Sequence, residues 1–137
     1  MRGRMIWMLI PAVGLTACYK STVTPDECKN EPTAEYPSKD GRWKSVAFLR
    51  QCGAGPTELQ VSVLPIAASL SNEPGNAFRQ DATPEGVEGH HSFGMQQMWK
   101  GPHELWISHE RGMKVGYAAS AVGAITVFHT NEDILEH

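Results

Sequence analysis

The alternation of apolar and polar residues is clearest in the middle of the chain, where it predicts β-strands. Within residues 57–65, Leu59, Val61 and Val63 alternate with polar side chains, a pattern typical of a strand with one buried face. The segment 42–52 instead carries apolar residues at both odd and even positions, which indicates a strand buried on both faces. A connection of four residues separates the two segments, and that length favours a β-hairpin.

Shorter stretches of the same alternation predict further strands towards the C-terminus. We expect them around Phe78 and over residues 93–99, 104–109 and 124–130. Residues 113–123 are rich in small side chains and fit either a bulged strand or a short helix. No apolar stripe with a 3.6-residue period is long enough to predict a helix with certainty. The pattern therefore predicts a mainly β fold, a small antiparallel sheet or open barrel of about five to seven short strands.

Glycine and proline mark the expected turns. Gly41 lies where a turn before the strand 42–52 would need a positive φ. Residues 73–76 have Pro at the second position and Gly at the third, which is the requirement for a type II turn. Residues 100–103 separate two expected strands, and the Gly-, Pro- and acid-rich segment 80–91 is expected to be a loop.

The first 17 residues have the pattern of a secretory signal peptide. A short basic stretch that ends at Arg4 precedes an apolar run over residues 5–17. As a helix this run would rise about 20 Å, which is too short for a hydrocarbon core of about 30 Å. The run ends in Leu15, Thr16, Ala17 and Cys18.

This ending resembles the lipobox of bacterial lipoproteins rather than a core helix that stops at an ordinary cysteine. The resemblance implies cleavage before Cys18, a diacylglycerol on its thiol and a further acyl chain on the new amino terminus. Two acyl chains already anchor a protein stably to a membrane. Because Tyr19 rather than Asp follows the cysteine, we expect the outer membrane, facing the periplasm, if the source is Gram-negative.

Residues 19–41 are polar, contain three prolines and show no apolar period. We interpret residues 18–41 as the lipidated N-terminus and a polar tether that holds a β-domain away from the membrane. That domain is expected over residues 42–130, and the polar tail 131–137 is expected to fray.

If Cys18 carries lipid, Cys28 and Cys52 remain as a pair in an oxidising compartment, and a disulfide between them is predicted. A metal site and a catalytic thiolate are the alternatives, but neither cysteine has a histidine beside it in the sequence. The predicted Cα separation is about 4.4–6.8 Å. Chain entropy gives a stabilisation of roughly 3.5 kcal/mol.

The composition narrows the function classes further. Apolar residues make up 41% and charged residues 20%, which argues against a disordered tract or a membrane bundle. The formal net charge is −3 and no two Lys or Arg residues are adjacent, so nucleic acid is not an expected partner.

Candidate catalytic chemistry is sparse. The chain has no nucleophile elbow, P-loop, zinc-protease helix or dinucleotide fingerprint. Neighbouring histidines at 90 and 91 point to opposite faces of an extended chain, and the others could meet only through strand pairing. We therefore expect no enzyme, no metal site and no cofactor, with solvated loop and strand histidines at His90, His91, His103, His109, His129 and His137.

Six short motifs follow one another along the middle of the chain: residues 28–31 (CKNE), 38–44 (SKDGRWK), 46–48 (VAF), 52–54 (CGA), 60–65 (QVSVLP) and 72–78 (NEPGNAF). Together they resemble the pattern SPDGKxKAVVFxRDCGATTG…STQVSILP…NEPGNxF of a family of small secreted bacterial proteins of unknown function. The resemblance covers about residues 28–109 and implies one β-rich domain and the Cys28–Cys52 pair. It implies no activity. The chain departs from the pattern at Gln51, where the family has Asp, at Gly55 and Pro56, and at His109.

The expected function is that of a lipid-anchored envelope protein, non-enzymatic, which binds another envelope protein or serves structurally. Trp43, Trp99 and Trp106 would then be core residues or an exposed aromatic binding surface. The alternative is an inhibitor module similar to periplasmic lysozyme inhibitors, which would insert the loop 80–91 into an enzyme cleft.

Overall fold

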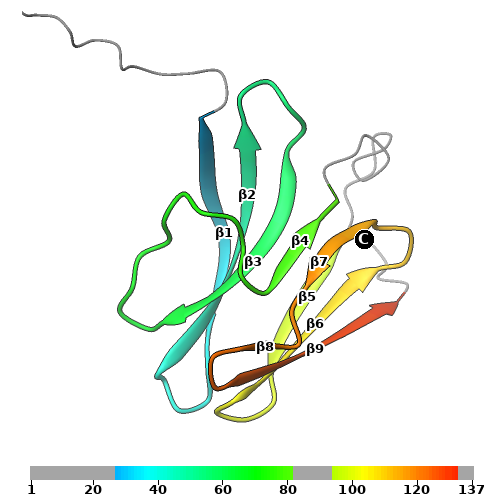
Figure 1. Ribbon diagram of the computed structural model, residues 1–137. Coiled ribbons are helices and arrows are strands. Elements are labelled where there is room, and N and C mark those ends of the chain that lie inside the picture. The colour runs from blue at the N-terminus through cyan, green and yellow to red at the C-terminus, as the bar shows by residue number, and fades with distance from the viewer. Residues whose placement is uncertain (1–26, 82–93, 133–137) are drawn as a thin grey trace, which may run out of the picture.

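The structure is a computed structural model, and it describes residues 27–81 and 94–132. Within these ranges the chain forms nine strands and no helix, so no helix of the described part could span a membrane. The predicted mainly β fold is confirmed. The strands form two sheets that are not closed into a barrel, and they are more numerous than the sequence predicted (Figure 1).

Five strands form sheet A in the spatial order β1-β2-β3-β4-β7, and all its neighbouring strands are antiparallel. Their bounds are Cys28–Pro37 for β1, Trp43–Cys52 for β2, Glu58–Pro65 for β3, Phe78–Gln80 for β4 and Val115–Ala118 for β7.

Four strands form sheet B in the order β5-β6-β9-β8, in which β6 and β9 are parallel. Residues 113–123 therefore contribute two short strands, β7 and β8, and no helix. The bounds in sheet B are Met95–Trp99 for β5, Glu104–Glu110 for β6, Ala121–Val122 for β8 and Ile125–Glu132 for β9.

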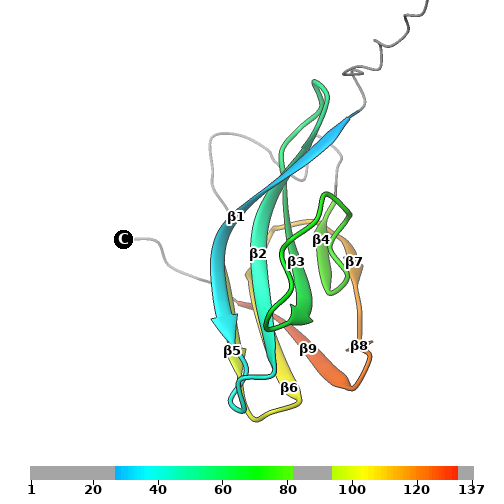
Figure 2. The ribbon, with the colours of Figure 1, turned by 90° about the vertical axis from the view of Figure 1, so that its left-hand side faces the viewer.

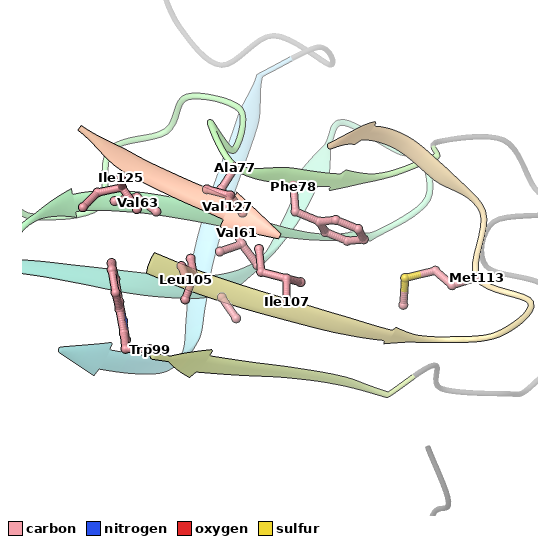
Figure 3. Close-up of a cluster of buried hydrophobic side chains, with 11 residues drawn as sticks. Val61, Val63, Ala77, Phe78, Trp99, Leu105, Ile107, Met113, Ile125 and Val127 are labelled. Carbon is pink, nitrogen blue, oxygen red and sulfur yellow. The ribbon is translucent and has the colours of Figure 1, made fainter. Parts of the chain in front are cut away.

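The core lies between the two sheets and takes side chains from both (Figure 3). Val61 and Phe78 of sheet A meet Leu105, Ile107 and Ile125 of sheet B, and all five are fully buried. Full burial of a side chain of this size is worth about 1.5–3 kcal/mol. This contact fixes which face of sheet B points inward and which points away from the core.

A long connection, residues 66–77, crosses the opposite, outer face of sheet A (Figure 1). Phe48 points to this face and is nevertheless fully buried, as are Gln60 and Ser62 to within a few per cent. The expectation that residues 57–65 have only one buried face is therefore wrong. The reason is that the chain itself covers the second face.

Gly75 is the point of closest approach in this cover. Gly75 does not have a positive φ, which a type II turn requires at its third position. The predicted type II turn over 73–76 is therefore wrong. A Cβ at Gly75 would lie 2.7 Å from the carbonyl oxygen of Val61 and 2.8 Å from that of Phe78. The glycine is needed here because the two backbones nearly touch. Its N–H donates to Gln60 Oε1 at 2.7 Å.

Asparagines fasten the cover in its middle and at its C-terminal end. Asn76 Oδ1 accepts from the N–H of Val63 at 2.7 Å, and its amide donates back to the Val63 carbonyl at 3.0 Å. Asn30 of β1 donates to the carbonyls of Ser71 at 2.9 Å and Glu73 at 2.7 Å. Asn30, Gln60, Gly75 and Asn76 thus have structural roles in this chain.

The expected tether is wrong for residues 28–37, because they form β1. Its backbone pairs with β2 along most of the strand, with an irregularity between Pro32 and Ala34. The apolar period is missing because β1 is an edge strand that buries little beyond Ala34. An edge strand also tolerates Pro32 and Pro37, whose lack of an N–H would break a central strand.

The Cys28–Cys52 disulfide is present, and it joins directly opposite residues of β1 and β2. Their Cα atoms are 3.9 Å apart, so the predicted range of about 4.4–6.8 Å is wrong. The N–H of Gly53 donates to the carbonyl of Glu27, which makes the cysteines a pair without mutual backbone bonds. Such pairs have the shortest Cα separation of an antiparallel ladder.

The remaining turn predictions hold where the structure describes them. Gly41 has a φ of 72°, and the hairpin between β2 and β3 turns at Gly53 with a φ of 59°. Strand β9 runs two residues beyond the predicted end at 130. The signal peptide with Cys18, most of the loop 80–91 and the tail 133–137 lie outside the described residues.

Candidate functional site

The outer face of sheet B carries an exposed row of large apolar side chains. The strand registers place Met98 of β5 beside Trp106 of β6, and Trp106 beside Phe128 of β9. Met98 is 57% exposed and Phe128 40% exposed. Successive residues of a strand alternate between its two faces, so the buried neighbours Leu105 and Ile107 oblige Trp106 to point outward.

Trp106 is held firmly in the middle of this row. Its ring stacks on Phe128 with centroids 4.7 Å apart, and Lys100 Nζ lies 4.0 Å from the ring centroid. Its indole N–H donates to Glu104 Oε2 at 2.6 Å. Because Phe128 comes from β9 and Lys100 from the end of β5, the two side chains approach the indole from opposite sides of β6.

The three tryptophans in the described part of the chain therefore have different positions. Trp99 belongs to the core, is 6% exposed and donates its indole N–H to the carbonyl of Tyr36 at 3.0 Å. Trp43 is partly buried and packs against the core, and Trp106 lies on the outer face. The core alternative is thus confirmed for Trp99, whereas Trp106 is half-buried on the outer face and its role in binding stays a prediction.

A groove of about 650 Å³ begins beside this row and continues round the edge of β5. Its floor includes the hydroxyls of Ser108 and Thr130, which are 3.0 Å apart. We call it the β5 groove and define it by residues of four strands, chiefly Tyr36, Gln96, Gln97, Met98, Lys100 and Trp106. A smaller hollow of about 350 Å³ lies across Lys100, where Thr126 and Phe128 line it.

One polar atom at the groove has no partner. Gln97 Oε1 is buried and has no hydrogen bond among the described residues. A buried acceptor without a partner costs about 1–3 kcal/mol. Gln97 thus combines a place in the lining of the groove with a buried acceptor that the described residues leave unsatisfied.

The edge of β5 offers backbone groups as well. Lys100 donates its N–H to the Glu104 carbonyl at 2.9 Å, and Glu110 donates to Gly94 at 3.0 Å. In an antiparallel ladder such bonds recur at every second residue. Gly94, Gln96, Met98 and Lys100 therefore face β6, while the intervening residues of β5 direct their N–H and C=O groups outward.

The histidines lie elsewhere. His109 and His129 flank the buried ring of Phe78, at centroid distances of 5.6 Å and 6.1 Å. The expectation of a solvated histidine is wrong for His109, which is buried, and His129 is half-buried, because both pack beside Phe78. His129 Nε2 is 2.7 Å from the carbonyl oxygen of Ala119, and His103 lies exposed in the turn before β6. Within residues 27–81 and 94–132, no three potential metal ligands come together. His90, His91 and His137 lie outside the described residues.

Sequence reasoning did not identify the β5 groove. The available signal was the presence of Met98 and Trp106 at positions that face away from the core in the strands 93–99 and 104–109. Phe128 joins them only through the parallel pairing of β6 with β9, which the alternation pattern does not reveal.

The comparisons with known proteins returned nothing: no family model, no curated protein and no solved structure matches the chain.

Proposed function

We propose that the chain is a lipid-anchored protein of the bacterial envelope whose β-domain is a non-enzymatic binding module. In this proposal Cys18 carries the lipid, and the β5 groove receives another envelope protein. The module faces the periplasm from the outer membrane if the source is Gram-negative. The sequence features that support the anchor are the signal peptide pattern and the lipobox.

The observation that carries the binding proposal is the exposed apolar row beside a groove. Large apolar side chains that gather on a surface favour a contact with a partner. The groove adds amide, hydroxyl and ammonium groups from Gln96, Ser108 and Lys100. These groups orient a bound molecule by hydrogen bonds, while Met98 and Trp106 supply apolar contact area.

Site-specific photocrosslinking in living cells tests the binding surface. A benzophenone amino acid replaces Met98 in the groove or, as the control, Ile66, which is 42% exposed in the connection over sheet A. We expect a reproducible crosslinked envelope protein from position 98 and none from position 66. Equal crosslinking at both positions, or none at position 98, would contradict the proposed surface.

The anchor is tested separately with the Cys18→Ser variant. We expect the variant to lose incorporation of an azido-fatty acid and to leave the membrane fraction, because the thiol that carries the lipid is gone. Undiminished labelling of the variant would exclude lipidation at Cys18.

A further inference from the structure

We propose that the β5 groove binds an extended peptide segment of the partner protein, which adds to sheet B as a new strand beside β5. This inference rests on the proposed function and specifies the class of partner that the binding surface recognises. It follows from the backbone of β5, the shape of the groove and its charge.

The backbone of β5 is arranged to accept another strand. It forms one edge of sheet B, and its ladder bonds to β6 use Gln96 and Met98 together with the flanking residues. The N–H and C=O groups of Met95 and Gln97 consequently point away from the sheet. Such a row of edge groups is a template for pairing with a further strand.

Strand β1 approaches this edge only at one end. Trp99 donates its indole N–H to the Tyr36 carbonyl of β1, and the two strands lie side by side there (Figure 2). From that point the groove follows β5 towards Met95 and is lined from both faces of the strand. A hollow that wraps round a strand edge has room for side chains on both faces of an added strand.

The charges and apolar groups of the groove specify what that strand carries. Lys100 is the one charged side chain among the described residues that line it. Met98 and Lys100 point to the same outer face and are two residues apart, the repeat distance of a strand. We therefore infer a partner segment with an apolar residue beside Met98 and a carboxylate two residues away, beside Lys100.

A glycan is the other ligand class that aromatic grooves bind, but the geometry of Trp106 favours the peptide. A sugar ring needs an open aromatic face, whereas the Trp106 ring already stacks on Phe128 and has the Lys100 ammonium 4.0 Å from its centroid. The outward N–H and C=O groups of β5 match the backbone of an extended peptide, which a sugar lacks.

The test begins with the full lipidated chain in detergent micelles and a phage library of random linear dodecapeptides. A selected peptide is then synthesised with single N-methyl groups at each position in turn. We expect about a tenfold loss of affinity at alternate positions only, because an added strand turns every second N–H towards its neighbour.

Variants of the protein test the same bonds from the other side. Gln97→Pro removes the outward N–H but no bond to β6, whereas the matched Gln97→Ala keeps that N–H. We expect Gln97→Pro to bind the selected peptide about tenfold more weakly than Gln97→Ala. We also expect Lys100→Gln to lose the preference for an acidic residue. If the proline variant does not fold, the N-methylated peptides, measured against the unaltered protein, still test whether the peptide binds as an added strand.

Several results would overturn the inference. These are failure to select any peptide, equal tolerance of N-methyl groups at all positions, or binding of neutral cell-wall glycan fragments in place of peptides. A dimer of the full chain that Gln97→Pro dissociates would make a second copy the occupant and would also overturn it.

If crosslinking from position 98 succeeds while peptide selection fails, the proposed function stands and the peptide inference falls. The reverse pattern would show that β5 binds peptides in vitro, but it would contradict the proposed envelope partner and the inference that the peptide is a segment of it.

Discussion

The outer faces of sheets A and B are similar in composition, because central strands of both sheets direct large apolar side chains away from the core. On sheet A, residues 66–77 cover Phe48, and the Phe48 side chain is therefore fully buried. On sheet B, Met98 and Phe128 stay about half exposed. A cover from the same chain stabilises the fold, whereas an apolar row without one favours a partner. The comparison therefore separates a structural face from the face that we propose to bind a partner.

The cover on sheet A depends on polar bonds as much as on apolar contact. Gln60 and Asn76 satisfy backbone groups that the connection buries, and Asn30 ties the far part of the connection to β1. Arg50 extends this tie by donating to Asn30 Oδ1 at 3.0 Å and to the Asn72 carbonyl at 2.9 Å. Buried polar groups need such partners, so the sequence of the connection is tightly constrained.

The largest expected effect comes from breaking the disulfide that anchors β1. Cys28→Ser should lower the free energy of unfolding by roughly 3.5 kcal/mol, because the unfolded chain regains loop entropy. Urea unfolding measures the change, with Lys29→Ser as the control on the neighbouring exposed residue. A loss below about 1 kcal/mol would contradict the view that the bond fixes β1 and, through Asn30, the cover on sheet A.

Closing the gap at Gly75 should have the next largest effect. Gly75→Ala places a methyl group against two carbonyl oxygens at 2.7 and 2.8 Å, so we expect a loss of about 2–3 kcal/mol. Gly55→Ala is the control, because its added methyl would meet one carbonyl oxygen at 3.3 Å. Peptide binding by the folded fraction should not change. Unaltered stability of Gly75→Ala would show that the connection does not press on sheet A.

On sheet B we expect the opposite result to that of Gly75→Ala, namely a small loss of stability and a large loss of binding. Trp106→Ala removes a side chain outside the core, and we expect it to lower the unfolding free energy by about 1 kcal/mol. The same variant should abolish crosslinking from position 98, because the wall of the groove is gone. A stability loss as large as that of Gly75→Ala, with binding retained, would make sheet B another structural face.

The smallest expected effect concerns the exposed turn between β1 and β2. The Ser38 hydroxyl donates to Asp40 at 2.8 Å and, with the Arg42 N–H, lowers the pKa of Asp40 below its usual 3.8. A lowered pKa contributes stability that is present above pH 3.8 and is lost as the pH falls through the folded-state value. NMR titration should give a midpoint below 3.8 that Ser38→Ala raises. A midpoint for Asp40 at its usual value of 3.8 would contradict the proposed contribution of this carboxylate to stability.

The sequence predicted those elements whose signal is local. Alternation located β2, β3, β6 and β9 to within a few residues, and the cysteine count predicted the pair of Cys28 and Cys52. Positive φ at Gly41 followed from its place before a strand. These features depend on neighbours within one strand or turn, so a single sequence contains the necessary information.

The features that sequence reasoning missed depend on contacts distant in the chain. β1 has no apolar period because it pairs at an edge and is fixed by a disulfide and by Asn30. The role of Gly75 is set by the backbone of β3, which lies more than ten residues away. The β5 groove requires the parallel register of β6 with β9. Only the fold brings these groups together.

Hydrogen exchange on intact membrane preparations of the source cells tests the central claim most directly. Amide exchange of the full chain is compared between native membranes and the purified protein in micelles. We predict slower exchange in native membranes at Met95 and Gln97, whose N–H groups a partner would cover, with no change in residues 66–77. Unchanged exchange in β5, or new protection confined to the connection over sheet A, would contradict the assignment of sheet B as the binding face.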